Sequence, residues 1–104
     1  MLLALSFPAA AQQPKKVPRI GFLVAGSASS VSARIEAFRQ GLLELGYIEG
    51  KNIVIEWRFA EGKSERVPAL AAELVRLKVD VIVSAGPAAT RPAKEATVTI
   101  PIVM

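Results

Sequence analysis

The sequence predicts an α/β fold: a parallel four-stranded sheet, doubly wound (Rossmann-like), with helices on both faces. Short apolar runs alternate with segments of helical periodicity, in the order strand, helix, strand, helix, strand, helix, strand. The connections between them are short, which favours right-handed crossovers between parallel strands. The length of 104 residues suits one domain, with 52% apolar residues for a core and 21% charged residues for a surface.

The first strand is predicted over residues 19–24, RIGFLV, because a continuous apolar run is typical of a parallel strand covered on both faces. A small-residue loop, 25–32, leads into a helix predicted over 32–45. Gly46 follows in the usual position after a helix C-terminus. Gly41, inside the helix, is interpreted as a point of close packing on the sheet. The apolar face of this helix consists of Ile35, Phe38, Leu42 and Leu45.

The second strand is predicted over residues 52–60 and lies nearer the edge of the sheet, because its side chains alternate in polarity. Trp57 is interpreted as a packing residue. One side of the strand carries Ile53, Ile55 and Trp57, and the other carries Val54, Glu56 and Arg58.

The remaining elements follow the same alternation. A helix over 64–78 has Pro68 near its first turn, and a continuous apolar run over 79–84 predicts a central third strand. A third helix starts near Pro87, and a fourth strand occupies 100–104. Pro92 means that this third helix either begins late or is kinked. The buried stripe of the second helix is predicted to be Val67, Leu70, Ala71, Leu74 and Leu77.

Residues 1–11, MLLALSFPAAA, are uncharged, almost wholly apolar and end in three alanines. We interpret them as a secretory signal peptide with cleavage after Ala11, whose start is truncated because no basic residue opens it. The alternative is a buried N-terminal strand or helix. Residues 12–18 are predicted to be a linker, and residues 19–104 an α/β lobe.

Composition excludes several classes of function. Cysteine and histidine are absent, which removes disulfides, thiolate metal sites and the usual general base, so we predict no catalytic residue, no metal and no cofactor. The formal charge of +4 arises from interspersed basic and acidic residues, which favours a solvated surface over nucleic-acid binding. The chain also lacks dinucleotide and P-loop phosphate motifs.

Ligands of open parallel sheets bind beyond the carboxyl ends of the strands. The loops expected there are 25–32, 60–64 and 84–90, and the first and third consist largely of Gly, Ala, Ser and Thr. Their N–H groups and hydroxyls could hold a carboxylate or phosphate. For Ser27 and Ser84 a capping or turn role is an equal alternative, and for Thr90 the two roles are balanced.

The segments GLLELGYIEGKNIVIEWR, LAAELVRLKVDVIV and ATVTIPIV together resemble the ABC transporter substrate-binding protein family, which includes tryptophan- and tyrosine-type amino-acid binders. The resemblance extends over residues 16–104. It implies a non-catalytic, periplasmic protein of the type I periplasmic-binding fold, with a small-molecule ligand held between two lobes. It also implies delivery to an ABC permease in the inner membrane and a monomeric state at full length.

Carried over to this chain, the resemblance places ligand contacts in two loops, at Gly26, Ser27, Ala28, Ser84, Ala85, Gly86 and Thr90. Pro92 departs from the family pattern, in which a helix-forming residue such as alanine is expected. The family's proteins are longer, so we interpret residues 19–104 as an incomplete N-terminal lobe that binds ligand weakly or not at all by itself.

Two other functions stay open at the sequence level. The chain could be an α/β enzyme acting on a nucleotide or a phosphorylated small molecule, with Glu61, Lys63 or Asp80 as polar groups. It could also be the effector-sensing domain of a transcription regulator. That function would require a DNA-binding segment upstream, where the export signal is predicted.

Overall fold

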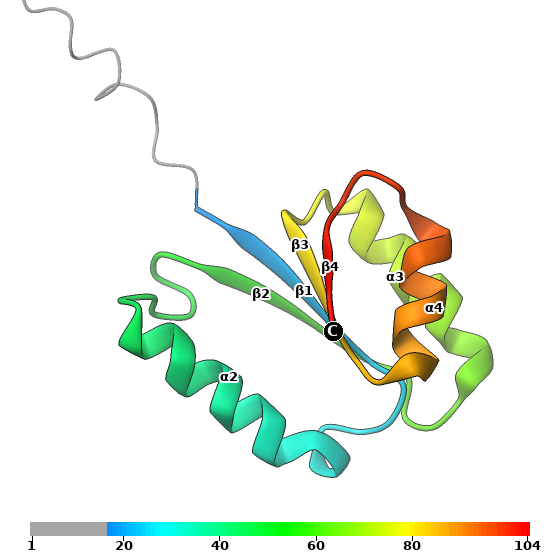
Figure 1. Ribbon diagram of the computed structural model, residues 1–104, viewed down its shortest axis with the longest axis horizontal. Coiled ribbons are helices and arrows are strands. Elements are labelled where there is room, and N and C mark those ends of the chain that lie inside the picture. Colours follow the sequence, from blue (N-terminus) through cyan, green and yellow to red (C-terminus); the bar gives the residue numbers. More distant parts are fainter. Residues whose placement is uncertain (1–16) are drawn as a thin grey trace, which may run out of the picture.

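The computed structural model describes residues 17–104, which form a sheet with helices on both faces (Figure 1). The strands are β1 (Arg19–Val24), β2 (Val54–Phe59), β3 (Val81–Ala85) and β4 (Ile102–Val103). They lie in the order β2-β1-β3-β4 and all neighbours pair in parallel. The predicted fold class is confirmed, as are the edge position of β2 and the inner position of β3. The predicted signal peptide lies outside the described residues.

The register brings the carboxyl ends of three strands level. Val24, the last residue of β1, is paired with Phe59 on β2 and with Ala85 on β3. Because all strands run in the same direction, the loops that follow these three residues leave the sheet along one edge.

Three helices cover the sheet. Helix α2 (Ser32–Glu44) follows a 3-10 turn, η2 (Ser29–Val31), and lies on one face (Figure 1). Helices α3 (Val67–Arg76) and α4 (Pro87–Ala96) lie on the other, and α3 begins with its own 3-10 turn, η3 (Ser64–Arg66). None of the helices within residues 17–104 has the length and apolar character needed to cross a bilayer.

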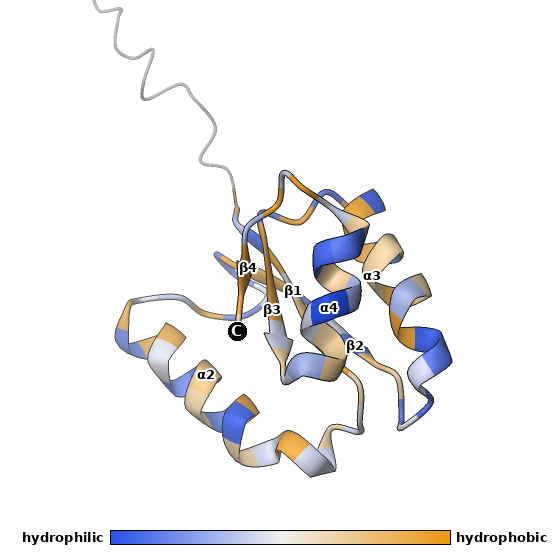
Figure 2. Ribbon diagram, turned by 45° about the vertical axis from the view of Figure 1, so that its right-hand side comes forward, coloured by the Kyte–Doolittle hydropathy of each residue, from blue (hydrophilic) through white to orange (hydrophobic). Residues whose placement is uncertain are grey.

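Each face of the sheet has its own apolar core, since successive side chains of a strand point to opposite faces. On the α3 and α4 side, Leu23 and Ile82 pack with Leu74 and Ala71, all fully buried. On the α2 side, Phe22, Val24, Ile35 and Ile55 form the second cluster. Figure 2 shows the corresponding pattern, with hydrophobic strands between helices that carry hydrophilic segments.

Helix α2 differs from the prediction in two respects. Leu45 was predicted to lie on the apolar face but is 76% exposed, because the helix ends one residue earlier, at Glu44. Gly41 is not a point of close packing: a Cβ atom built there would meet no other atom within 4 Å. Gly46 does follow the helix end with a φ of +92°, as expected for a glycine in that position.

Helix α4 begins at Pro87, as predicted, and the alternative of a late start with Pro92 in the first turn is wrong. The helix starts early because the N–H groups of Ala89 and Thr90 both donate to the carbonyl of Gly86. Pro92 then occupies the interior of the helix, where it removes the N–H that would bond to the carbonyl of Ala88. The buried residues Ala89, Thr90 and Ala93 hold this helix on the sheet.

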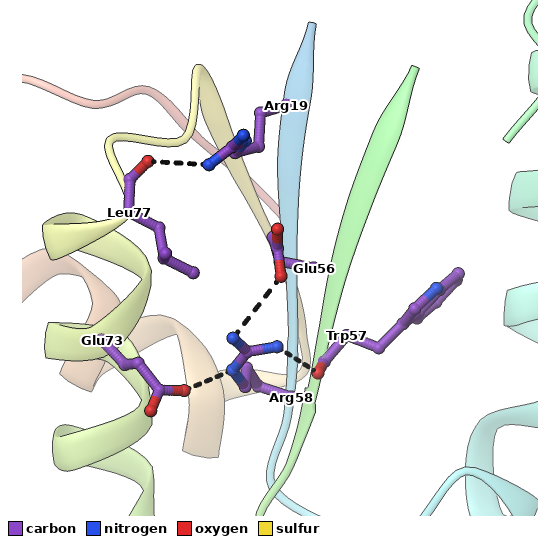
Figure 3. A network of polar contacts seen from close by, with 6 residues as sticks. All are labelled: Arg19, Glu56, Trp57, Arg58, Glu73 and Leu77. Atoms are coloured by element: carbon purple, nitrogen blue, oxygen red, sulfur yellow. Dashed lines mark hydrogen bonds and ion pairs between the residues drawn. The ribbon is translucent and has the colours of Figure 1, made fainter. Parts of the chain in front are cut away.

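Two polar networks attach β2 to the helices on either side, and Figure 3 shows the one on the α3 side. On the α3 side, Arg58 contacts Glu73 of α3 and lies 3.5 Å from Glu56, while Trp57 points to the opposite side of the strand. On the α2 side, the Glu49 carboxylate accepts hydrogen bonds from the Trp57 indole at 2.8 Å and from Arg39 at 3.2 Å. The Arg39 guanidinium also lies 4.8 Å from the centre of the Trp57 ring.

Candidate ligand-binding site

The three loops predicted to face a ligand leave the sheet along the same edge, and two of them are joined by backbone hydrogen bonds. The N–H of Glu61 donates to the carbonyl of Gly26 at 3.0 Å, and the N–H of Gly62 donates to the carbonyl of Ala25 at 2.8 Å. These two hydrogen bonds hold the loop after β1 against the loop after β2.

The loop after β1 is a tight turn built from small residues. The Ser30 hydroxyl donates to the carbonyl of Ser27 at 2.7 Å, and the Ser27 and Ser29 hydroxyls lie 3.0 Å apart. A Cβ atom on Gly26 would lie 2.7 Å from the Ser30 hydroxyl oxygen, so a larger residue would disturb this turn. Within the described chain, the N–H groups of Gly26, Ser27 and Ala28 donate no hydrogen bond.

The loop after β3 is fixed by a buried relay of hydroxyls. Ser84 and Thr90 are 2% and 6% exposed, and their hydroxyl oxygens lie 2.7 Å apart. Thr90 donates its proton to the carbonyl of Gly86 at 2.9 Å, so Ser84 is the donor to Thr90. Both hydroxyls are thus engaged with the loop itself, and what they supply to the site is the position of Ala85 and Gly86.

Gly86 connects the end of β3 to the start of α4 with a φ of +91°. This backbone conformation is strained for any residue with a Cβ atom. Glycine therefore allows the strand to turn directly into the helix, with only Gly86 between Ala85 and Pro87.

Two hollows adjoin at the carboxyl end of β3. One, of about 650 Å³, lies on the α2 side, and the other, of about 490 Å³, lies on the α4 side. Both include Gly86 and Met104. The first is lined by Phe22, Arg34, Ala37, Phe38, Val83, Ser84, Ala85, Gly86 and Met104, and the second by Gly86, Pro87, Thr90, Arg91, Lys94 and Met104.

The structure thus brings together only part of the predicted site. Ser84, Ala85 and Gly86 line one hollow, Gly86 and Thr90 line the other, and the loop at 26–28 lines neither. Sequence reasoning missed Arg34 and Phe38, although their spacing of four residues places them on the same side of a helix. The same spacing is equally typical of side chains that pack a helix on a sheet, so it does not by itself indicate a site.

The three polar residues that an α/β enzyme could use, Glu61, Lys63 and Asp80, lie at opposite ends of the parallel strands. Glu61 and Lys63 follow the carboxyl end of β2, whereas Asp80 precedes the amino end of β3. The Asp80 carboxylate accepts a hydrogen bond from the N–H of Arg19 at 2.8 Å, which ties the amino ends of β1 and β3 together. The three groups therefore do not assemble into one catalytic site.

Comparison with known proteins identifies the family. Residues 19–104 match the profile described as ABC transporter substrate binding protein. The chain belongs to this ABC transporter substrate-binding family. The family is one of binding proteins rather than enzymes, and the resemblance predicted from the sequence is confirmed. A search of curated proteins gives no significant match.

Three solved structures share the fold. The ligand-free, open form of CD0873 from Clostridium difficile, a substrate-binding protein with adhesive properties, is 26% identical with a TM-score of 0.78. A conserved domain protein from Vibrio cholerae is 27% identical with a TM-score of 0.80. An ABC domain from Streptococcus pneumonia, solved in complex with L-Trp, is 25% identical with a TM-score of 0.77.

These matches cover 83%, 85% and 84% of this chain, but 29%, 30% and 29% of the respective neighbours. The chain therefore spans less than a third of the length of these three structures.

Proposed function

We propose that the chain acts in the substrate-binding component of an ABC-type importer and captures a small solute in a cleft between this lobe and a second one. The family match over residues 19–104 is the observation that carries this proposal. The level carboxyl ends of β1, β2 and β3 support it, since ligands of parallel α/β sheets bind along that edge.

In this proposal the two small-residue loops have different tasks. The N–H groups of Gly26, Ser27 and Ala28 donate to the ligand, because the described chain leaves them without acceptors. Ala85 and Gly86 form the facing wall of the site, and the Ser84–Thr90 relay holds that wall in place.

The ligand that we propose is an aromatic carboxylate such as an aromatic amino acid. Support comes from the L-Trp complex of the Streptococcus pneumonia neighbour. The rings of Phe22 and Phe38, with centroids 5.1 Å apart, line the larger hollow and suit an apolar ligand body.

An NMR titration of the ¹⁵N-labelled chain with L-tryptophan tests the binding site. We expect millimolar ligand to shift the amide signals of residues 26–28 and 84–90. The hollow of about 230 Å³ lined by Leu43 and Tyr47 provides an internal comparison, since it lies away from these loops. Shifts confined to that hollow, or turnover of an added substrate, would contradict the proposal.

We also propose that the protein is exported to the periplasm and delivers its ligand to a permease in the inner membrane, with no cofactor and no nucleic-acid partner. The apolar, alanine-terminated segment 1–11 supports export. Expressed with its own N-terminus in a Gram-negative bacterium, the protein should appear in the periplasmic fraction with Gln12 as its first residue. An uncleaved cytoplasmic product would argue against this localisation.

A further inference from the structure

The turn after β2 has a left-handed backbone at two successive residues. Glu61 has a φ of +58° and Gly62 a φ of +83°, and the N–H of Lys63 closes the turn by donating to the carbonyl of Ala60 at 3.0 Å. A positive φ is uncommon for a residue with a Cβ atom, and it persists where surrounding contacts require it. The backbone conformation of Glu61 therefore has its cause in the contacts of this turn.

Those contacts are backbone hydrogen bonds to the end of β1. Three successive N–H groups, those of residues 60, 61 and 62, donate to the carbonyls of Val24, Gly26 and Ala25 at 2.9, 3.0 and 2.8 Å. Successive residues of an extended strand point their groups to opposite sides. All three N–H groups therefore reach the end of β1 because the chain reverses its direction at Glu61 and Gly62.

These hydrogen bonds also fix the direction of the next N–H groups in the loop after β1. Each carbonyl shares a planar peptide unit with the N–H of the following residue, and in a trans unit the two groups point in opposite directions. The described residues contain no cis peptide bond. The carbonyls of Ala25 and Gly26 point toward the turn after β2, so the N–H groups of Gly26 and Ser27 point away from it, toward the side of β1 on which β3 lies.

Two adjacent N–H groups that point the same way suit an anionic oxygen such as that of a carboxylate. Neither of these N–H groups donates a hydrogen bond within the described chain. Resting on the proposed function, in which they bind the ligand, we infer that the turn at Glu61 and Gly62 positions them. The turn acts through the two peptide units that join residues 25–27, and it does not contact the ligand itself.

A pair of glycine substitutions tests this role. Gly62→Val places a β-branched residue at a φ of +83°, so the turn must rearrange to accept it. Gly50→Val is the matched control, because Gly50 has a φ of +85° and an added Cβ atom would meet no other atom within 4 Å at either glycine. Gly50 precedes β2 and Gly62 follows it, so the same backbone strain is introduced at opposite ends of one strand.

NMR of the complete ¹⁵N-labelled chain gives two readouts. In the free protein, the backbone order parameters of Gly26 and Ser27 should fall in Gly62→Val and stay unchanged in Gly50→Val. In titrations with L-tryptophan, binding at residues 26–28 should weaken about two- to tenfold in Gly62→Val, the effect of one lost hydrogen bond, and change by less than about twofold in Gly50→Val. Both variants should lose thermal stability, so a merely structural role would affect both readouts equally in the two variants.

The outcomes separate this inference from the proposed function. Equal order parameters and equal affinities in the two variants would overturn the positioning role and leave the ligand site in place. If about ten millimolar L-tryptophan shifts no amide of the unmodified chain, the proposed function fails. A loss of order confined to Gly62→Val would then still support the positioning role, and its absence would overturn it. If the amide spectrum shows that Gly62→Val is unfolded, Gly62→Ala and Gly50→Ala repeat the comparison with a smaller strain.

Discussion

Ser84 and Thr90 are the buried polar residues of the described lobe, and together they connect β3 to α4. The hydroxyl of Ser84 depends on Thr90 as its acceptor, whereas the carbonyl of Gly86 also accepts from the N–H groups of Ala89 and Thr90. Loss of the threonine hydroxyl therefore leaves Ser84 unsatisfied but leaves Gly86 with partners. A buried hydroxyl without a partner is unfavourable, and a pair removed together is much less so.

This asymmetry predicts how substitutions combine. Thr90→Val should lower the free energy of unfolding by about 1–3 kcal/mol, because it leaves the Ser84 hydroxyl buried and unpaired. The double variant Ser84→Ala, Thr90→Val should lose less than the sum of the single variants, with a coupling of at least about 0.5 kcal/mol. Urea unfolding measures each value.

The exposed residue Thr99 offers a control for the valine substitution. Thr99→Val should change the free energy of unfolding by less than about 0.5 kcal/mol, since it lies on the surface. Additive effects of the Ser84 and Thr90 substitutions would show that the two hydroxyls do not depend on each other.

At the scale of elements, the helices are held with unequal strength. Val67, Ala71 and Leu74 of α3 are buried, whereas α2 buries only Ile35 among its thirteen residues. Helix α2 is held further by contact of the Phe38 ring with Phe22 and by the ion pair of Arg39 with Glu49. We therefore expect the amides of α2 to exchange with solvent before those of α3.

Two glycines provide a matched test of how closely each layer is packed. A Cβ atom on Gly41 of α2 would meet nothing within 4 Å, whereas one on Gly21 of β1 would lie 2.9 Å from both methyl carbons of the fully buried Leu74. Gly41→Ala should stabilise the protein by about 0.5–1 kcal/mol, because alanine favours the helix. Gly21→Ala should destabilise it by about 1–3 kcal/mol through overpacking.

Thermal unfolding followed by circular dichroism measures both changes. Equal effects of the same sign would contradict the packing described for the two faces. Combining Gly21→Ala with Leu74→Val should recover part of the loss from Gly21→Ala if the clash with Leu74 is its cause.

The bounds of a strand or helix are predictable where residues next to the element determine them. The bounds of β1 follow from an apolar run between Pro18 and a small-residue loop, and the end of α2 follows from Gly46. The role of Gly41 could not be predicted, because periodicity shows which face of a helix is apolar but not how near the opposite layer lies. Gly86 turns the chain directly from β3 into α4, so the helix begins at Pro87 even though a proline at position 92 disfavours a helix interior.

The candidate site was predictable to the extent that it follows from topology. Parallel strands place the loops after Val24 and Ala85 at one edge, and small residues mark both loops. The two hollows beside Gly86 were not predictable, because their linings depend on how α2 and α4 settle on opposite faces of the sheet. The inward hydrogen bonds of Ser84 and Thr90 likewise depend on how α4 docks.

At the scale of the whole molecule, the proposed function assigns one wall of a ligand site to the described residues. The chain spans 29–30% of the length of its structural neighbours. Small-ligand sites usually bury about 70–90% of the ligand surface, and both hollows here are open to solvent. One wall therefore supplies only part of the contact area that tight binding needs.

We accordingly predict that the 104-residue chain binds L-tryptophan with a dissociation constant above about 100 µM, which corresponds to less than roughly 5.5 kcal/mol of binding free energy. Isothermal titration calorimetry measures the value directly, and Gly86→Val provides a control in which the wall itself is disturbed by a residue unsuited to a φ of +91°. Adding a second lobe should strengthen binding because it would enclose the ligand and exclude water from the same N–H groups. Micromolar binding by the isolated chain would mean that this lobe already encloses its ligand, and the two-lobed cleft would then have to be abandoned.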